Sequence, residues 1–354
     1  MAPFVVPVFL LGLVVPSALG SGASDAAIAS EATAVVERVR TADGYEIVLS
    51  HRPSPGGPPV ILCHGVSSNH RFWDLAPGRS LAEFLQQRGF DVWNLDLRGH
   101  GLAERDGAGR RQPAGWTVDD YGRYDLPAAI AFVRTRSRSD DVAYVGHSMG
   151  GMVLAVYLAS VDKPHLSAVV TAGAPLDFGT ADPVVSWLLD LAPWASRIPY
   201  LPTPLGARIL AWMGDLAPFN VEEMLFNPAN VAKEVRAPMF NAIVSPLSSG
   251  EIRQFALSGD SGAFRSADGK QTYQDQLGHV TVPMLFLAGG ADRVVHPDQV
   301  RRYYDAVGAA EREFVVVSLA NGFSADYGHL DFGIADRAVT DIFPRIERWF
   351  REHP

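Results

Sequence analysis

Ser148 is the residue whose sequence context points most directly to chemistry. It is the third residue of GHSMG at positions 146–150, a Gly-x-Ser-x-Gly pattern that lies between a predicted strand and a predicted helix. A serine on such a sharp turn exposes its hydroxyl, and the small flanking glycines avoid steric clashes. The pattern therefore predicts a nucleophilic serine. The alternative is a strand–helix turn of small residues without activity.

A serine hydroxyl is a weak nucleophile and needs a general base, which in this strand–turn–helix arrangement follows the serine and an acid in the chain. We predict that the base is His329, in SADYGHLDF, because it lies between the last predicted strand and the last predicted helix. His296 is an alternative by position. The other histidines after Ser148 lie at the starts of predicted strands or at the chain end: His165, His279 and His353.

Asp292 is the predicted acid that orients this histidine. It directly follows the apolar run VPMLFLAGG, so it is expected at the same sheet edge as Ser148. Asp326 and Asp331 flank His329, but neighbours in sequence do not easily reach its Nδ1. We interpret both as solvated loop charges.

Acyl transfer also needs donors for an oxyanion, usually backbone N–H groups. Met149, directly after the serine, is expected to supply one, and Val66, in the loop after the apolar run PVILC, the other; Gly65 would allow the close approach. His64, His100 and His147 are interpreted as structural. No histidine pair has metal-ligand spacing with a carboxylate at hand, so we predict no metal and no cofactor.

Strands alternate with helices around these residues, which predicts an α/β fold with a mostly parallel central sheet. A turn at Asp43-Gly44 joins the first two predicted strands. Helices are expected at 79–88, 120–138, 150–160, 297–307 and 338–351. We assign residues 36–176 and 276–354 to this core. Residues 177–275, rich in proline and leucine and without clear strands, are predicted to be a helical insertion.

Composition limits the function classes. The 354 residues include 30 Lys and Arg against 39 Asp and Glu, a net charge of −9, so nucleic acid is not an expected partner. The single cysteine, Cys63, excludes an internal disulfide.

Residues 1–20 are apolar and end in small residues, which predicts a signal peptide and export; an N-terminal membrane anchor or a misassigned start is the alternative. Residues 21–35 are expected to be a linker.

Together these residues resemble the α/β-hydrolase superfamily over 36–176 and 276–354, and 177–275 lies where that superfamily places its cap. The segments DGYEIVLSHRP, GFDVWNLDLRGHG and YGHLDF resemble acid lipases. The segments DLAPGRSLAEFLQQRGFDVWNLDLRG, WTVDDY and GHLDF resemble polyhydroxyalkanoate synthases. Those synthases use cysteine as the nucleophile, whereas this chain has Ser148. The same position excludes the relatives with an aspartate nucleophile.

These observations predict a serine hydrolase that cleaves carboxylic esters through an acyl-enzyme. The apolar residues of 177–275 suggest an apolar acyl or lipid-like substrate and a contact with a lipid interface; their alternative role is the insertion's own core. Amidases, peptidases, thioesterases, lactonases, perhydrolases, an acyltransferase related to the polymer synthases and a silent binding protein stay open, as does the oligomeric state. The predicted substrate-binding residues are Trp187, Trp194 and Trp212.

Overall fold

The structure is a computed structural model that describes residues 34–179, 195–206 and 221–354. The predicted signal segment 1–20, nearly all of the predicted linker and the three tryptophans predicted to bind substrate lie outside these ranges. Within them, no helix has both the length and the apolar character needed to cross a membrane.

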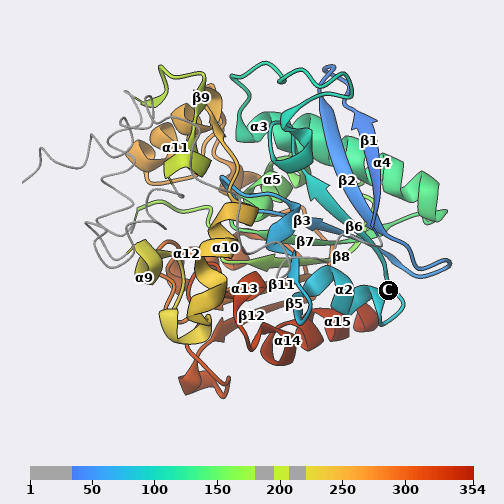
Figure 1. Cartoon of the computed structure of the whole chain (residues 1–354), viewed down its shortest axis with the longest axis vertical. Helices are drawn as coiled ribbons and strands as arrows, with labels where there is room; N and C mark the ends of the chain where they lie inside the picture. Colours follow the sequence, from blue (N-terminus) through green and yellow to red (C-terminus); the bar gives the residue numbers. More distant parts are fainter. Residues whose placement is uncertain (1–33, 180–194, 207–220) are drawn as a thin grey trace, which may run out of the picture.

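The centre of the molecule is an eight-stranded sheet with the order β1-β2-β6-β3-β7-β8-β11-β12. β1 pairs with β2, and β2 with β6, in the antiparallel sense; all later neighbours are parallel. Figure 1 shows this twisted sheet with helices around it, which confirms the predicted fold class. The strands are β1 (Val35–Arg40), β2 (Glu46–Arg52), β3 (Pro59–Cys63), β6 (Asp91–Asp96), β7 (Val142–His147), β8 (Leu166–Ala172), β11 (Met284–Gly289) and β12 (Arg312–Val317).

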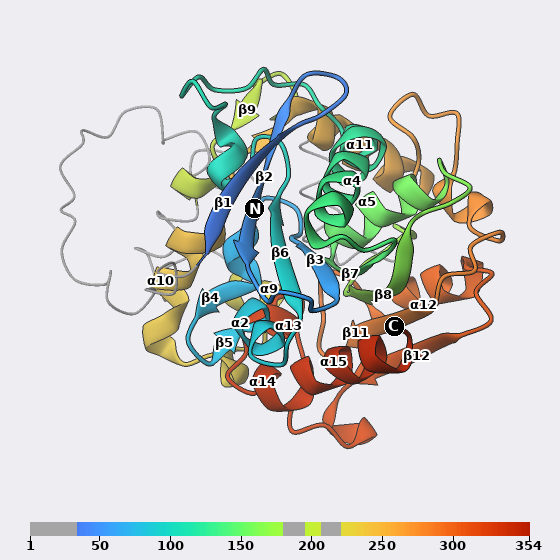
Figure 2. The ribbon, with the colours of Figure 1, turned by 90° about the vertical axis from the view of Figure 1, so that its right-hand side faces the viewer.

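Helices cover both faces of the sheet (Figure 2). One face packs against α4 (Leu126–Ser137), α5 (Met149–Leu158) and α12 (Pro297–Ala306). The other face packs against α2 (Leu81–Gln86), α13 (Asp331–Ile334), α14 (Ala338–Asp341) and α15 (Phe343–Glu352). Because side chains alternate along a strand, β3 supplies both layers: Ile61 and Cys63 pack with α4 and α5, whereas Val60 and Leu62 pack on the opposite side.

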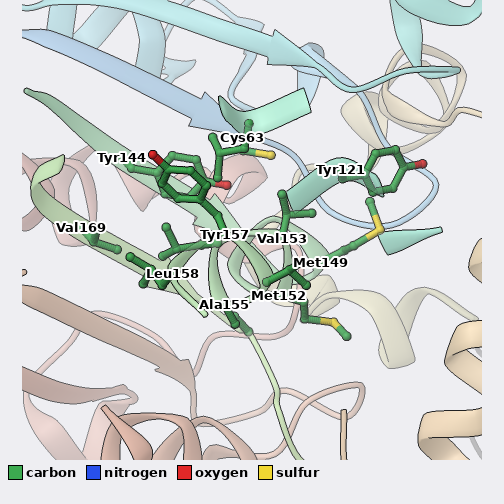
Figure 3. Packing of buried hydrophobic residues seen from close by; sticks show 14 of the residues in the cluster. Cys63, Tyr121, Tyr144, Met149, Met152, Val153, Ala155, Tyr157, Leu158 and Val169 are labelled. Atoms are coloured by element: carbon green, nitrogen blue, oxygen red, sulfur yellow. The ribbon is translucent and has the colours of Figure 1, made fainter. Parts of the chain in front are cut away.

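The layer beneath α5 holds the strand–helix turn at Ser148 in place. Figure 3 shows Cys63, Tyr121 and Tyr144 packed with residues of α5 such as Val153. The Tyr144 hydroxyl donates to the carbonyl oxygen of Gly150 at 2.7 Å. The first turn of α5 is therefore fixed to β7 both by apolar packing and by a buried hydrogen bond.

Several predicted helices are shorter or divided. The helix predicted at 79–88 is α2, which Ser80 caps by accepting from the N–H of Glu83 at 2.8 Å. The helix predicted at 120–138 consists of α3 (Val118–Asp120), a π-helical turn (Tyr121–Asp125) and α4. The helix predicted at 338–351 is divided into α14 and α15. A short hairpin, β4 (Asp74–Ala76) and β5 (Arg79–Ser80), precedes α2.

The described parts of the insertion lie together at one end of the sheet (Figure 1). They include α9 (Val221–Leu225), α10 (Lys233–Ile243) and α11 (Ser249–Ser261). The sequence showed no clear strands in this segment, but the structure adds the two-residue strands β9 (Tyr200–Leu201) and β10 (Leu247–Ser248), which pair in the antiparallel sense.

Strand register brings loops from distant parts of the chain to one edge of the sheet. Cys63, the last residue of β3, pairs with Gly146 of β7, and His147 pairs with Ala172 of β8. The carboxyl ends of these parallel strands therefore lie side by side, which is where open α/β sheets place their ligand sites.

Candidate active site

Ser148 lies in a strained turn between β7 and α5. Its backbone angles are φ 49° and ψ −116°, a conformation that residues with a Cβ rarely adopt. A Cβ on Gly146 would lie 2.7 Å from the carbonyl carbon of Gly150, and a Cβ on Gly150 would lie 2.8 Å from the carbonyl oxygen of His64. The flanking glycines are thus required by close backbone contacts, as the pattern predicted.

The structure brings Ser148, His329 and Asp292 together. Nε2 of His329 lies 3.0 Å from the Ser148 hydroxyl oxygen, and its Nδ1 lies 2.8 Å from Oδ2 of Asp292. The three residues are 6%, 3% and 2% exposed, respectively. Because a carboxylate only accepts, Nδ1 is the donor of this pair, and in the neutral imidazole Nε2 then carries no proton and faces the hydroxyl. A histidine in this state can take the serine proton.

The carboxylate of Asp292 is fixed by the loop that follows β11. Its Oδ1 accepts from the N–H groups of Val294 at 2.9 Å and Val295 at 2.8 Å, which leaves Oδ2 for His329. In addition, the N–H of Ala291 donates to the carbonyl oxygen of Tyr327 at 2.9 Å. The loops that carry the acid and the histidine are therefore bound to each other.

His147 supports His329 through the backbone. Its Nε2 donates to the carbonyl oxygen of His329 at 2.9 Å, and its ring stacks on Phe72 with centroids 4.1 Å apart. Burial lowers the pKa of His147 well below the usual histidine range, so the ring is neutral. The contact is with the peptide and not with Ser148, in line with a structural role.

The loop after β3 approaches the nucleophile closely. A Cβ on Gly65 would lie 3.2 Å from Cβ of Ser148 and 2.8 Å from Nδ1 of His147. Within the part of the chain that the structure describes, the N–H groups of Val66 and Met149 have no acceptor. Backbone donors without an intramolecular partner next to a nucleophile are suited to an oxyanion, and Met149 in addition lies at the N-terminus of α5.

The family described as alpha/beta hydrolase fold matches residues 58–325, which is more than half of the chain. The chain belongs to the α/β-hydrolase fold family. Triacylglycerol lipase 1 of Arabidopsis thaliana is 25% identical, over 88% of this chain and 86% of the lipase. The poly(3-hydroxyalkanoate) polymerase subunit PhaC of Haloferax mediterranei is 24% identical, over 83% of this chain but only 58% of the polymerase.

A solved structure shows the same architecture. A thermophilic esterase from Thermogutta terrifontis superposes with a TM-score of 0.60 at 19% identity, and the match covers 90% of this chain and all of the esterase chain. At this identity the likeness shows the α/β-hydrolase fold alone.

In this α/β-hydrolase, the interpretation of Asp331 as a solvated loop charge was wrong. It is fully buried and not a solvated charge: its Oδ2 accepts from the N–H of Gly328 and from Nδ2 of Asn230, both at 2.7 Å. Burial raises the pKa of Asp331 to about 6. Asp326, only partly buried, accepts from the N–H of Leu319 at 2.9 Å. Asp331 thus connects the histidine loop to the insertion, which sequence neighbours alone did not reveal.

His64 and His296, two other histidines considered from the sequence, form their hydrogen bonds away from Ser148. His64 is fully buried, with Nδ1 2.8 Å from the carbonyl oxygen of Gly65 and Nε2 accepting from the N–H of Leu97 at 3.3 Å. His296, the alternative base, caps the start of α12. No group of three His, Cys, Asp or Glu side chains in the described ranges is placed to hold a metal. The absence of a metal or cofactor stays a prediction.

His100 belongs to a buried polar cluster beneath the insertion. Its Nδ1 donates to the carbonyl oxygen of Arg98 at 3.0 Å, and its Nε2 lies 3.8 Å from Oε1 of Glu251 on α11. Oε2 of Glu251 accepts from the N–H of Ser248 at 2.7 Å. Burial lowers the pKa of His100 to about 3 and raises the pKa of Glu251 to about 7. Both side chains are therefore neutral in mildly acidic solution.

Glu251→Gln is expected to remove a pH dependence of stability. The folded-state pKa of Glu251, about 7, exceeds the ordinary 4.5, so its stabilisation is complete below pH 4.5 and is lost as the pH rises to 7. The contribution of Glu251 to the free energy of unfolding of the wild type falls by about 3 kcal/mol over this pH range. Denaturant unfolding at pH 5 and pH 8 should show the variant gaining about 2–3 kcal/mol relative to wild type between the two values. The exposed Glu223→Gln is the control, and equal gains in both variants would contradict the prediction.

Proposed function

We propose that the protein is a serine hydrolase that cleaves carboxylic esters with Ser148 as nucleophile, His329 as general base and Asp292 as the orienting acid. The observation that carries this proposal is the pair of contacts of one imidazole, 3.0 Å to the serine hydroxyl and 2.8 Å to the buried carboxylate. A serine, a base and an acid connected in this order activate the hydroxyl for attack on an acyl group.

The reaction has two halves in this proposal. Ser148 Oγ attacks the ester carbonyl while Nε2 of His329 takes its proton, and the N–H groups of Val66 and Met149 donate to the oxyanion. His329 then protonates the departing alcohol, which leaves an acyl-serine. In the second half, His329 deprotonates a water that attacks this ester, and it then returns the proton to Ser148 Oγ as the bond between this oxygen and the acyl carbon breaks, which releases the carboxylic acid and the free serine.

The substrate class rests on different support. The plant relative is named a triacylglycerol lipase, and the insertion is rich in apolar residues, so we propose an ester with an apolar acyl chain. An exported location and a contact of the insertion with lipid are part of the same proposal.

Hydrolysis of nitrophenyl esters from acetate to palmitate tests the proposal. Wild type should turn over members of the series, and an alkyl fluorophosphonate should label Ser148 and abolish turnover; Ser148→Ala is the unlabelled control. A preference for long chains supports a lipid-like substrate, and a preference for short chains replaces it by a small ester. Absence of turnover and of labelling in the folded wild type would contradict the proposed function.

Acyl transfer to an alcohol is the second candidate, because the polymerase subunit aligns with most of this chain. Ser148 stands where the resembling polymer synthases carry cysteine, which favours water as acceptor. Product analysis with an acyl thioester and an added alcohol distinguishes the two. Predominant ester formation in dilute alcohol would favour the transferase.

A further inference from the structure

Ser245 connects the insertion to the catalytic end of the sheet. It lies between α10 and β10 and is 1% exposed. Its N–H donates to the carbonyl oxygen of Ser67 at 2.9 Å. Its hydroxyl oxygen accepts from the N–H of Gly101 at 3.0 Å and from Nδ2 of Asn69 at 3.2 Å. One residue of the insertion therefore binds both the loop after β3 and the loop after β6.

Ser67 is held from the same side. Its Oγ lies 2.7 Å from the carbonyl oxygen of Ser245 and 2.8 Å from the hydroxyl of Thr203, which also belongs to the insertion. The φ of Ser67 is 53°, in the left-handed region that disfavours residues with a Cβ. Contacts on both its backbone and its side chain oppose relaxation of this conformation.

The position of Ser67 gives these contacts a meaning for catalysis. Ser67 directly follows Val66, whose N–H is the proposed oxyanion donor, and Gly65 on the other side packs against Ser148. The loop is thus held at one end by the nucleophile turn and at the other by the insertion. Fixing Ser67 limits where the intervening N–H can point, and an oxyanion donor is effective only when it is oriented in advance.

We propose that Ser67 and Ser245 are positioning residues of the oxyanion hole, through which the insertion sets the geometry of hydrolysis without touching the substrate. This inference rests on the proposed function. It predicts that loss of the Ser67 hydroxyl, or of the Ser245 hydroxyl that holds Asn69 in the same loop, weakens stabilisation of the tetrahedral state more than it weakens substrate binding.

Ser67→Ala and Ser245→Ala test the inference with a nitrophenyl ester. After correction for active enzyme by phosphonate titration, kcat should fall about tenfold while KM changes by less than about twofold, because removal of a complete oxyanion donor costs 10²–10³ and this loss is partial. Binding of an alkyl boronic acid, whose adduct with serine is tetrahedral, should weaken in parallel.

Ser258→Ala is the matched control. Its buried hydroxyl accepts from the N–H of Arg265 at 3.2 Å, within the insertion, so its loss should lower stability and leave kcat and boronate affinity unchanged. Ser67→Gly covers the case in which the alanine variants fold poorly, since glycine adopts the left-handed conformation without strain yet lacks the hydroxyl; its kcat should also fall.

Wild-type kcat and boronate affinity in Ser67→Gly and in the folded alanine variants would overturn the inference. A wild type that neither hydrolyses esters nor binds the boronate would instead overturn the proposed function on which it rests.

Discussion

The Asp292→Asn variant should keep its fold and lose about 10³–10⁴-fold of kcat for ester hydrolysis. The expected loss is large because the substitution leaves the histidine in place and changes only where its proton lies. Asp292 is 2% exposed, and asparagine has nearly the same shape, so the surrounding packing should persist.

The loop after β11 determines how the new amide is oriented. The N–H groups of Val294 and Val295 both donate to Oδ1, so the amide oxygen must take that place and the NH₂ group must face His329. An NH₂ group donates to Nδ1, which transfers the ring proton to Nε2. A protonated Nε2 facing Ser148 cannot take the serine proton.

Steady-state kinetics on a nitrophenyl ester, together with thermal unfolding, measure this effect. Asp331→Asn is the matched control, because it makes the same change in a buried carboxylate two residues after His329 that does not contact the ring. The control should stay within about tenfold of wild type. If Asp331→Asn lost more activity than Asp292→Asn, the result would contradict our proposal that Asp292 is the acid that orients His329.

Gly65→Ala is expected to reduce kcat by about 10²–10³, the cost of removing an oxyanion donor. The new methyl group would lie 2.8 Å from Nδ1 of His147 and 3.2 Å from Cβ of Ser148. Neither neighbour is the free end of a flexible chain, because both belong to the buried turn between β7 and α5. The loop must therefore retreat, and the N–H of Val66 retreats with it.

Gly278→Ala controls for the loss of a glycine as such, since a Cβ at that position would meet no atom within 4 Å. Its kcat and melting temperature should match those of wild type. Boronic acid affinity separates a displaced oxyanion loop from a general loss of structure. Unchanged kcat and boronate affinity in Gly65→Ala would show that this loop does not hold the oxyanion.

The sequence was informative wherever local chemistry and strand order act together. Its glycine-flanked motif predicted the serine at a strand–helix junction, and position along the chain predicted an aspartate after the next-to-last strand and a histidine after the last strand. Parallel strands then place their carboxyl ends at one edge. The alternation of strands and helices predicted the fold class, and the motifs around the serine and the histidine carried the resemblance to the family. The three side chains lie within hydrogen-bonding distance.

Contacts between segments that are far apart in the sequence could not be predicted from local motifs or strand order. From its sequence neighbours, Asp331 was expected to be a charge on a surface loop. In the structure it accepts a hydrogen bond from Asn230, about a hundred residues earlier in the chain. Ser245 belongs to no motif, and its hydrogen bonds with Ser67 and Asn69 form only because the chain after α10 lies beside the loop after β3. The π-helical turn inside the predicted helix 120–138 likewise depends on tertiary packing, since Gly122 lies against Val156 of α5.

Because Cys63 is buried, its reaction with a thiol reagent reports local unfolding of the protein. This thiol, the single one in the sequence, ends a central strand between β6 and β7, and burial raises its pKa to about 12. A thiol reagent reaches it only after β3 separates from its neighbours, so the labelling rate measures the frequency of that opening. Every variant described above can be ranked for stability in its native buffer, without denaturant and without an introduced label.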